Sequence, residues 1–341
     1  MNLEEKIEAF SKLGSQLKNL TNEELDDLSY KARSENPWFT HNSVVQSIQG
    51  IAYMLQPQSI NQWVSNYNLS STSEKRIGVA MAGNIPMVGF HDMLCVLIAG
   101  HTLVAKLSSQ DTVLIQYLVD SLKKINEEFS TKILFEERLK NIDAIIATGS
   151  DNTSRYFEYY FRNIPHIIRK NRSSCGVIIG EENPLEISKL GSDIFSYFGL
   201  GCRNISKIYI PTGYEIKNLM EPIEHYKEII HHNKYVNNYD YRKSIFLVNG
   251  DNYYDNGFLL LIENEKLVSP ISVLYFEYYL SLEDLNSKIS LHTDKIQCIA
   301  SAKGWVKGSI PFGTTQQPEL WDYADQVDTI EFLSSAFKVQ N

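Results

Sequence analysis

The first 70 residues mix apolar and polar positions in the amphipathic pattern that is typical of helices. Thr21 and Glu24 have the spacing of a capping box, in which each side chain bonds the backbone N–H of the other residue. This pair precedes Leu28 and predicts the start of a helix. Residues 59–64, which follow Pro57, are predicted to form another short helix.

From residue 76 onward, short apolar runs alternate with longer amphipathic segments. One of these segments places Leu114, Leu118 and Leu122 on a single helical face. An alternation of strands and helices is typical of a parallel α/β sheet. Strands are predicted at residues 76–82, 102–107, 142–147 and 175–179, and helices at residues 90–99, 111–129 and 185–198, with a further turn and helix after residue 147.

The last third of the chain repeats this alternation with different spacing and predicts a second α/β unit. Strands are predicted at residues 207–211, 244–248, 273–276 and 297–300, with helices at residues 217–231 and 282–290. We therefore expect a boundary near residue 199. Residues 1–198 would form the N-terminal helices and the first α/β unit, and residues 199–341 the second.

The composition is that of a soluble globular protein, with 43% hydrophobic and 21% charged residues among 341. A formal net charge of −9 argues against general affinity for nucleic acid or anionic membranes. Charged and histidine residues interrupt the most apolar stretch, residues 85–105, so no membrane span is expected. The N-terminus lacks the pattern of a signal peptide, and we expect a cytoplasmic protein.

The four cysteines lie far apart and form no C-x-x-C pair, which argues against a disulfide framework or a structural metal site. Cys202, in FGLGCRN, is a candidate nucleophile because the two preceding glycines allow close approach to a ligand. The charge of Arg203 favours the thiolate form. The alternative is a buried structural cysteine, since free cysteine is often buried. Cys95 and Cys175 lie in apolar runs and are predicted to be core residues.

Polar residues also follow the predicted strands, where ligands gather in α/β sheets. Asn84, in AGNIP, offers an amide donor suited to an oxyanion, although Gly-Asn is also ordinary turn chemistry. The basic run RKNR at residues 169–172 could meet phosphates or form a solvated loop. Six further residues at strand ends are candidates for holding a nucleotide: Lys106, Ser108, Ser109, Thr148, Gly149 and Ser150. The alternatives are a solvated lysine at a strand end and an ordinary helix cap.

Taken together, these segments resemble the aldehyde dehydrogenase superfamily over residues 75–335. More narrowly, the chain looks like the LuxC-type acyl-CoA reductases, which make fatty aldehyde for bacterial luminescence. The segments that carry the resemblance follow the family's order: GNIP, GHTLVAKLSS, ATGSDNTSRYF, FGLGCRN and SPISVLYFE. The segment IPFGTTQQPELWDYADQVDTIEFL is similar to the narrower family's C-terminal region.

The resemblance implies a Rossmann-like cofactor domain and a second α/β catalytic domain. It implies that Cys202 is the nucleophile and that Asn84 is the side-chain donor to the oxyanion. Lys106 would contact the adenosine ribose of the cofactor, and Ser150 would lie by its pyrophosphate. The implied activity is that of an oxidoreductase (EC 1.2.1) that reduces acyl-CoA to aldehyde through a Cys202 thioester. A homo-oligomer and a partner enzyme that supplies acyl groups are further implications.

Two departures from the superfamily refine this expectation. Hydrolytic aldehyde dehydrogenases carry a glutamate general base before the strand that holds Cys175, but residues 165–174 contain no carboxylate. Water would then not be activated at Cys202, which suits acyl exchange with CoA. NAD-preferring relatives often carry a glutamate three residues after the ribose-binding lysine, where this chain has Ser109. Serine does not repel a 2′-phosphate, so NADPH is the expected cofactor.

Three questions stay open at this point. The glutamate that holds the nicotinamide ribose in the superfamily has no clean match, since Glu265 lies near the place but Lys266 fits the position better. Four tyrosines could line a long apolar tunnel, although core packing explains them equally well: Tyr253, Tyr254, Tyr278 and Tyr279. The alternative functions are a hydrolytic NAD(P)-dependent aldehyde dehydrogenase and a non-catalytic nucleotide-binding protein on the same fold.

Overall fold

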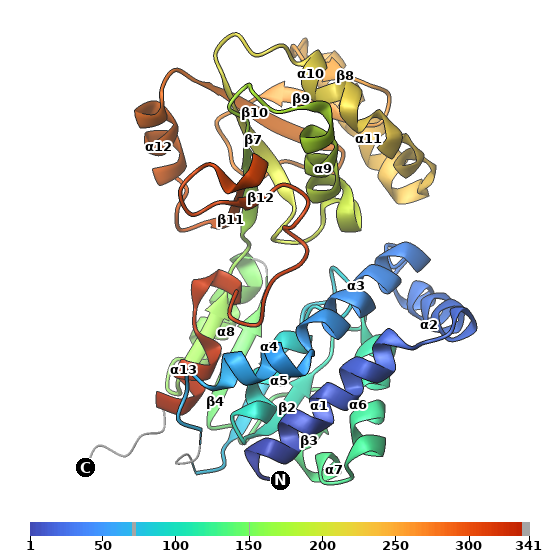
Figure 1. The fold of residues 1–341 in the computed structure, drawn as a ribbon, viewed down its shortest axis with the longest axis vertical. Coiled ribbons are helices and arrows are strands. Elements are labelled where there is room, and N and C mark those ends of the chain that lie inside the picture. The colour runs from blue at the N-terminus through green and yellow to red at the C-terminus, as the bar shows by residue number, and fades with distance from the viewer. Residues whose placement is uncertain (70–72, 150, 336–341) are drawn as a thin grey trace. The chain divides into compact units, whose positions relative to one another are not determined.

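The computed structural model describes residues 1–69, 73–149 and 151–335, which form two compact units (Figure 1). Unit 1 contains residues 1–171 and the chain from residue 318 onward, and unit 2 contains residues 172–317. The predicted boundary at residue 199 is therefore corrected to residue 172. The reason is that β6 (Ser173–Val177) pairs with β7 and β11 in the middle of the unit 2 sheet. The predicted second domain also ends earlier, because the C-terminal segment returns to unit 1.

Unit 1 begins with four helices, as the amphipathic pattern predicted: α1 (Leu3–Lys18), α2 (Asn22–Glu35), α3 (His41–Met54) and α4 (Pro57–Val64). The predicted capping box is confirmed at the start of α2. The Glu24 backbone N–H donates to Thr21 Oγ1 at 3.3 Å, and the Thr21 backbone N–H donates to Glu24 Oε2 at 2.8 Å. Helix α1 packs against α3, α4 and α6 and buries Phe10 and Leu13 completely.

The sheet of unit 1 has five parallel strands in the order β3-β2-β1-β4-β5. Its central strands are buried apolar runs, as expected for a parallel sheet that is covered on both faces. The strands are β1 (Arg76–Ala80), β2 (Thr102–Lys106), β3 (Ile133–Phe135), β4 (Ala144–Thr148) and β5 (His166–Arg169). The helices between them are α5 (Phe90–Ile98), α6 (Thr112–Ile125), α7 (Phe129–Lys132) and α8 (Asp151–Phe161). The predicted leucine face of α6 is buried in the core.

The C-terminal segment of unit 1 contains the short 3₁₀ helix η4 (Ala324–Gln326) and α13 (Thr329–Ser335). Helix α13 packs on α5, and Leu320, Ile330 and Leu333 are completely buried in the unit 1 core. This segment is therefore an integral part of the unit that carries the N-terminal helices.

Unit 2 contains a seven-stranded sheet in the order β12-β11-β6-β7-β10-β9-β8. Every pairing is parallel except that of β8 with β9. The remaining strands are β7 (Ile205–Pro211), β8 (Tyr254–Asp255), β9 (Leu260–Glu263), β10 (Val273–Tyr279), β11 (Ile296–Ser301) and β12 (Ile310–Pro311). The α-helices are α9 (Pro184–Phe195), α10 (Lys217–Met220), α11 (Asn233–Asn249) and α12 (Leu282–Ser290). The 3₁₀ segments are η1 (Ser196–Gly199), η2 (Glu221–His231) and η3 (Ala302–Gly304).

One predicted strand is wrong. Residues 244–248 form the last part of α11, which buries Tyr235 and Tyr239 one turn apart. The helix ends at Gly250, whose positive φ of 71° closes it. Leu247 and Val248 are 63% and 88% exposed, so this apolar run is a helix surface and not a buried strand.

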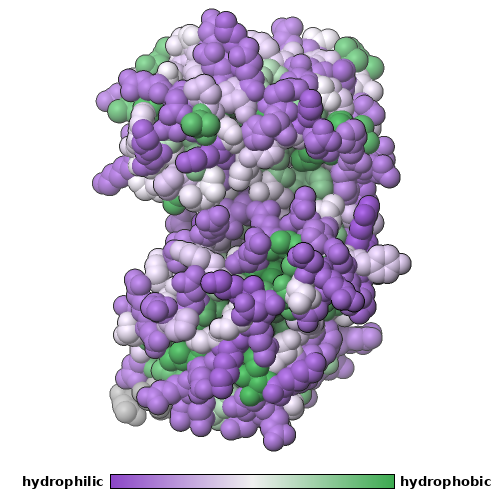
Figure 2. All heavy atoms as spheres, turned by 45° about the vertical axis from the view of Figure 1, so that its right-hand side comes forward, coloured by the Kyte–Doolittle hydropathy of each residue, from purple (hydrophilic) through white to green (hydrophobic). Residues whose placement is uncertain are grey.

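Within the described residues, no helix is both long enough and apolar enough to cross a lipid bilayer. Figure 2 shows mainly hydrophilic side chains on the visible face of both units, with apolar atoms in separate groups.

Candidate active site

The carboxyl edge of the unit 1 sheet gathers most of the predicted cofactor residues. Strands β1, β2 and β4 are parallel neighbours, with Ala80 paired to Lys106 on one side and to Ala147 on the other. The segments that follow these strands therefore leave the sheet at one edge. The strand order also reverses at β1, which is where nucleotides bind in open α/β sheets.

The turn that carries Asn84 lies directly against the segment after β2. A Cβ atom on Gly83 would lie 2.5 Å from Ser108 Oγ, so only glycine fits there without movement of Ser108. The Asn36 side-chain amide of α2 donates to the Gly83 carbonyl at 3.1 Å. Asn84 itself is exposed at this turn. The turn that precedes Asn84 thus lies against Ser108, and these two residues were predicted as separate candidates.

A buried carboxylate fixes the far end of the same turn. Asp111 is only 2% exposed, and its Oδ2 accepts the Met87 backbone N–H at 2.7 Å. Met87 has a positive φ of 56°, which is unusual for a residue with a side chain. The Ser47 hydroxyl of α3 donates to the Pro86 carbonyl at 2.7 Å. Sequence reasoning missed Asp111, although it lies only two residues after Ser109.

The other cofactor candidates lie at the ends of β2 and β4. Lys106 is exposed and its Nζ donates to the Glu137 carbonyl at 2.7 Å, while Ser109 is exposed. Thr148 and Gly149 are half-buried, and a Cβ on Gly149 would lie 2.9 Å from Thr153 Cβ. Helix α8 begins two residues later, so its first N–H groups face this edge. The predicted Ser150 lies outside the described residues.

These observations fit a nucleotide cofactor. Polar donors end β2 and β4, the two parallel strands on either side of β1. A side chain at Gly149 would crowd Thr153, and the N-terminus of α8 follows.

The basic run at residues 169–172 is structural and does not form a phosphate site. Arg169 is 4% exposed and its Nη1 donates to Asp92 Oδ2 at 2.5 Å. Lys170 pairs with Glu158 at 3.0 Å, and Arg172 Nη1 donates to the Ile296 carbonyl at 3.2 Å. The basic side chains of this run therefore serve ion pairs and backbone contacts.

Asp111 predicts a pH dependence of stability. Burial raises the pKa of Asp111 from 3.8 to about 7, and the nearby Glu35 carboxylate adds to the effect. The folded state therefore holds this proton more tightly than the unfolded chain does. The stabilisation is complete below pH 3.8 and is lost as the pH rises through about 7. Asp111→Asn, which keeps an oxygen for Met87, should raise the free energy of unfolding relative to wild type by about 2–3 kcal/mol more at pH 8 than at pH 5.

Urea titrations of both proteins at the two pH values would measure this difference. Asp120→Asn, on the exposed face of α6, is the matched control. A stability difference between Asp111→Asn and wild type that is the same at both pH values would contradict the assignment.

Cys202 lies in unit 2, in the turn three residues before β7, at the edge where β6 and β7 begin. It is half-buried. The approach to this turn is unusual, since Tyr197, Phe198 and Gly199 have φ values of 49°, 58° and 79°. Left-handed backbone costs about 1–2 kcal/mol for a residue that is not glycine, and such conformations cluster at functional sites. Of the two glycines in the predicted approach to Cys202, Gly199 therefore has the left-handed backbone, which Tyr197 and Phe198 before it share.

The cysteine loop, residues 201–204, is held by three hydrogen bonds of side chains, one from outside the loop and two from residues within it. Ser174 Oγ on β6 donates to the Cys202 carbonyl at 3.0 Å. Asn204 Oδ1 accepts the Gly201 backbone N–H at 2.9 Å. Arg203 Nε donates to the Thr315 carbonyl at 2.6 Å. The loop is therefore a fixed feature of the fold that presents a half-buried thiol.

The remaining cysteines divide into two kinds. Cys95 and Cys175 are completely buried, as predicted, and burial raises the pKa of both, that of Cys175 to about 12. They are core residues. Cys298 is half-buried, and its Sγ lies 3.0 Å from Ser174 Oγ, the same hydroxyl that bonds the Cys202 carbonyl. No local pattern marks this proximity, because Ser174 and Cys298 are 124 positions apart.

The tyrosines considered for an apolar tunnel occupy different parts of unit 2. Tyr279 is a core residue whose hydroxyl donates to the Ile178 carbonyl at 2.9 Å. Tyr254 and Tyr278 line a pocket of about 480 Å³ at the carboxyl ends of β7 and β10. This edge lies about 20 Å along the strands from the edge that carries Cys202.

The segment that contains Glu265 and Lys266 is tied to the sheet by a buried lysine. Lys207 is 0% exposed, and its Nζ donates to the Asn264 carbonyl at 3.0 Å and the Glu265 carbonyl at 2.9 Å. It also forms an ion pair with Glu277. The sequence had not singled out Lys207 as more than a strand residue.

Comparison with solved structures identifies the fold, whereas no protein-family model and no curated protein matches the sequence. The chain is similar to aldehyde dehydrogenase 21 from Physcomitrella patens, with a TM-score of 0.68 and 11% identity over 99% of this chain and 85% of that one. It is also similar to an aldehyde dehydrogenase from Bacillus cereus, with a TM-score of 0.62 and 13% identity over 88% and 72%. A propionaldehyde dehydrogenase from Clostridium phytofermentans gives a TM-score of 0.60 and 9% identity over 88% and 78%. The predicted fold class is confirmed: the chain has the α/β fold of the aldehyde dehydrogenases.

Proposed function

We propose that this protein is an NADPH-dependent acyl-CoA reductase of the LuxC type that forms an acyl thioester on Cys202. The observation that carries the proposal is the cysteine loop, in which hydrogen bonds of the Ser174, Arg203 and Asn204 side chains fix the chain around a half-buried thiol. The aldehyde dehydrogenase fold supports it, since its structural neighbours are aldehyde dehydrogenases, one of them a propionaldehyde dehydrogenase.

The proposed chemistry begins with attack of the Cys202 thiolate on the thioester carbonyl of acyl-CoA. The new C–Sγ bond places a negative charge on the carbonyl oxygen. The resemblance to the LuxC-type reductases assigns the Cys202 backbone N–H and the Asn84 amide as donors to this oxyanion, and each such donor is typically worth about 3 kcal/mol of barrier. The carbonyl then re-forms as the C–S bond to CoA breaks, and the CoA thiolate leaves.

NADPH, when bound, supplies the hydride that reduces this acyl group. Collapse of the resulting oxyanion re-forms the carbonyl, breaks the C–Sγ bond, releases the aldehyde and restores the Cys202 thiolate. The residues proposed to hold the cofactor are those at the carboxyl edge of the unit 1 sheet, namely Lys106, Ser108, Ser109, Thr148 and Gly149. Ser150, which lies outside the described residues, is proposed on the resemblance alone. The absence of a carboxylate at Ser109 favours NADPH over NADH.

A spectrophotometric assay tests the proposal. NADPH oxidation would be followed with a panel of acyl-CoA chain lengths, with NADH as the control. We expect acyl-CoA-dependent oxidation of NADPH with release of CoA, and slower turnover with NADH. Oxidation of an aldehyde to the free acid without CoA would instead favour a hydrolytic enzyme. If the protein neither reduces acyl-CoA nor oxidises aldehyde, the result would favour a non-catalytic nucleotide-binding protein.

Asn84→Ala provides a separate test of the oxyanion donor. Loss of one such donor should lower kcat on the order of 100-fold. The Asn36–Gly83 and Asp111–Met87 bonds on either side of the residue should preserve the turn. Asn61→Ala, which removes an exposed amide of α4, is the matched control and should leave kcat unchanged. A kcat for Asn84→Ala within about twofold of wild type would remove this residue from the proposed chemistry.

The proposal also includes a cytoplasmic location, a homo-oligomeric state and a partner enzyme that supplies acyl groups. These rest on the resemblance to the LuxC-type reductases.

A further inference from the structure

We propose that Asp193 is a positioning residue for Cys202, which it holds through the strap formed by residues 313–315 and through Arg203. The inference rests on the proposed function insofar as it takes Cys202 to be the nucleophile. Asp193 belongs to α9, and nothing in its sequence context had drawn attention to it.

Asp193 is completely buried, and its carboxylate accepts three hydrogen bonds from the strap. Oδ2 accepts the Gly313 backbone N–H at 2.7 Å. Oδ1 accepts the Thr315 backbone N–H at 3.1 Å and the Thr315 hydroxyl at 2.8 Å. Gly313 has a positive φ of 85°, so the strap turns sharply where it meets the carboxylate. One side chain thus fixes both ends of a segment that belongs to no helix or strand.

The strap in turn holds Arg203. Thr315 is completely buried, and its carbonyl accepts Arg203 Nε at 2.6 Å. The N–H and hydroxyl of Thr315 are both committed to Asp193, so the direction of its carbonyl depends on that carboxylate. Arg203 follows Cys202 directly, and its charge is the one that we expect to favour the thiolate. If the strap lost its hydrogen bonds to Asp193, the Arg203 side chain next to the nucleophile would no longer be held in place.

A second connection runs from the backbone of Asp193 to the other side of Cys202. Asn204 Nδ2 donates to the Asp193 carbonyl at 3.2 Å and to the Ser196 carbonyl at 2.7 Å, while its Oδ1 accepts the Gly201 N–H. The cysteine loop is thereby tied to the end of α9 before and after Cys202. The two connections do not depend on each other, because only the first uses the carboxylate.

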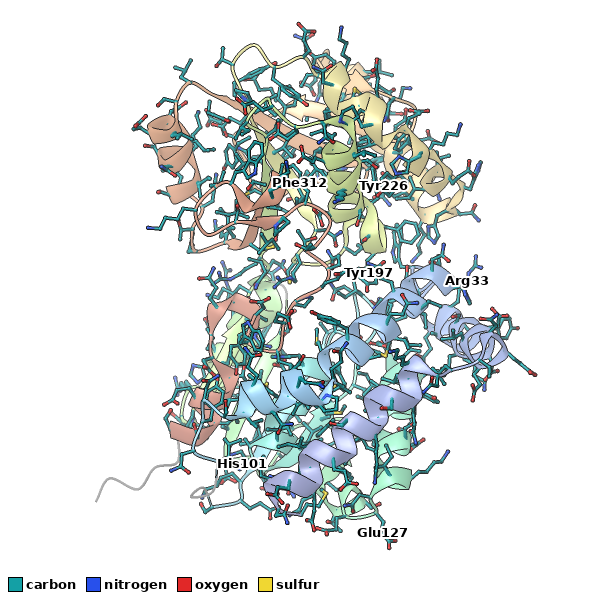
Figure 3. All side chains as sticks on the ribbon, viewed as in Figure 1. Arg33, His101, Glu127, Tyr197, Tyr226 and Phe312 are labelled. Carbon is teal, nitrogen blue, oxygen red and sulfur yellow. The ribbon has the colours of Figure 1, made fainter. Side chains whose placement is uncertain are left out.

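Packing alone does not explain a carboxylate at this position. A buried charge is costly unless strong hydrogen bonds compensate for it, and burial raises the pKa of Asp193 to about 6. Apolar contacts already anchor helix α9 (Figure 3). Tyr226 packs against Gly191, and Phe312, directly before the strap, is buried in the same apolar cluster as the helix. The three hydrogen bonds to the strap are thus the specific contribution of this side chain.

The test compares four variants by the rate at which iodoacetamide alkylates Cys202, measured by peptide mass spectrometry, and by kcat and KM with acyl-CoA. Asp193→Asn replaces one acceptor oxygen, and Thr315→Val removes one donor while keeping the shape of the side chain. Thr315→Ser keeps the hydroxyl. Glu182→Gln is the matched control, because Glu182 also accepts two backbone N–H groups in unit 2, from Ile179 and Gly180, but after β6 and away from Cys202.

We expect Asp193→Asn and Thr315→Val to lower both the alkylation rate of Cys202 and kcat by about tenfold or more. The reason is that each substitution weakens or removes a charge-assisted hydrogen bond between the carboxylate and the strap. KM should stay within about twofold of wild type. Thr315→Ser and Glu182→Gln should match wild type. If Asp193→Asn does not fold, the comparison of Thr315→Val with Thr315→Ser decides the question.

Two results would overturn the proposal. One is wild-type alkylation of Cys202 in both Asp193→Asn and Thr315→Val. The other is an equal loss in Thr315→Ser or Glu182→Gln, which would indicate general destabilisation. Failure of the proposed function looks different, since acyl-CoA turnover would then be absent in wild type or retained in Cys202→Ala, while the alkylation rates would still report on the strap.

Discussion

Cys202→Ala is expected to abolish aldehyde formation from acyl-CoA. In the proposed chemistry the Cys202 thiolate is the nucleophile that attacks the thioester, so the acyl-enzyme cannot form without it. The effect should appear in kcat and kcat/KM together, since the lost bond forms only along the reaction path. NADPH oxidation with the best acyl-CoA of the panel would measure it.

The same variant should still bind NADPH, because the residues proposed to hold the cofactor lie in unit 1 and Cys202 lies in unit 2. Binding would be followed through the fluorescence of the reduced nicotinamide. Cys95→Ala, which removes a core thiol of unit 1, is the matched control and should keep its kcat. Full turnover in Cys202→Ala would rule out the covalent mechanism.

Asp92→Ala is expected to destabilise unit 1 strongly. Asp92 and Arg169 form a buried ion pair at 2.5 Å, and their side chains are 9% and 5% exposed. Arg169 also donates to Thr329 Oγ1 at 3.1 Å, so its side chain connects β5 to α13. Removal of the carboxylate would leave a buried guanidinium without its counter-charge, which typically costs about 3–5 kcal/mol.

The free energy of unfolding from urea titration would measure this loss. Asp27→Ala is the matched control, because it breaks a pair with Lys31 at 2.6 Å whose members are both more than half exposed. Such exposed pairs are worth about 0–1 kcal/mol. The double variant Asp92→Ala/Arg169→Met should recover part of the stability, since it removes the unpaired charge as well. An equal effect of Asp92→Ala and Asp27→Ala would contradict the structural role of the buried pair.

The parallel α/β architecture could be predicted because buried strands of a parallel sheet are continuous apolar runs between amphipathic helices. Residues 244–248 show the limit of this reasoning, since SIFLV has the composition of a strand but lies on an exposed helix face. The strand that actually pairs with β10 in this region is β9. A short apolar run does not distinguish the two cases. The domain boundary was missed because the position of β6 depends on strands far away in the sequence.

Only those residues of the candidate site that directly follow a predicted strand could be identified from the sequence. Asn84 and Lys106 could be found in this way, because the carboxyl ends of neighbouring parallel strands meet at one edge. The residues that hold the loops could not. Asp193 acts on Thr315, which is 122 positions further along the chain. No local pattern marks such a pair.

The most direct test of the central claim is the mass of the protein after reaction with acyl-CoA in the absence of NADPH. The account predicts an increase that equals one acyl group, located on the peptide that contains Cys202, absent from Cys202→Ala and discharged as aldehyde when NADPH is added. An unmodified protein, an acyl group on another residue, or release of free acid into water before NADPH is added would contradict it.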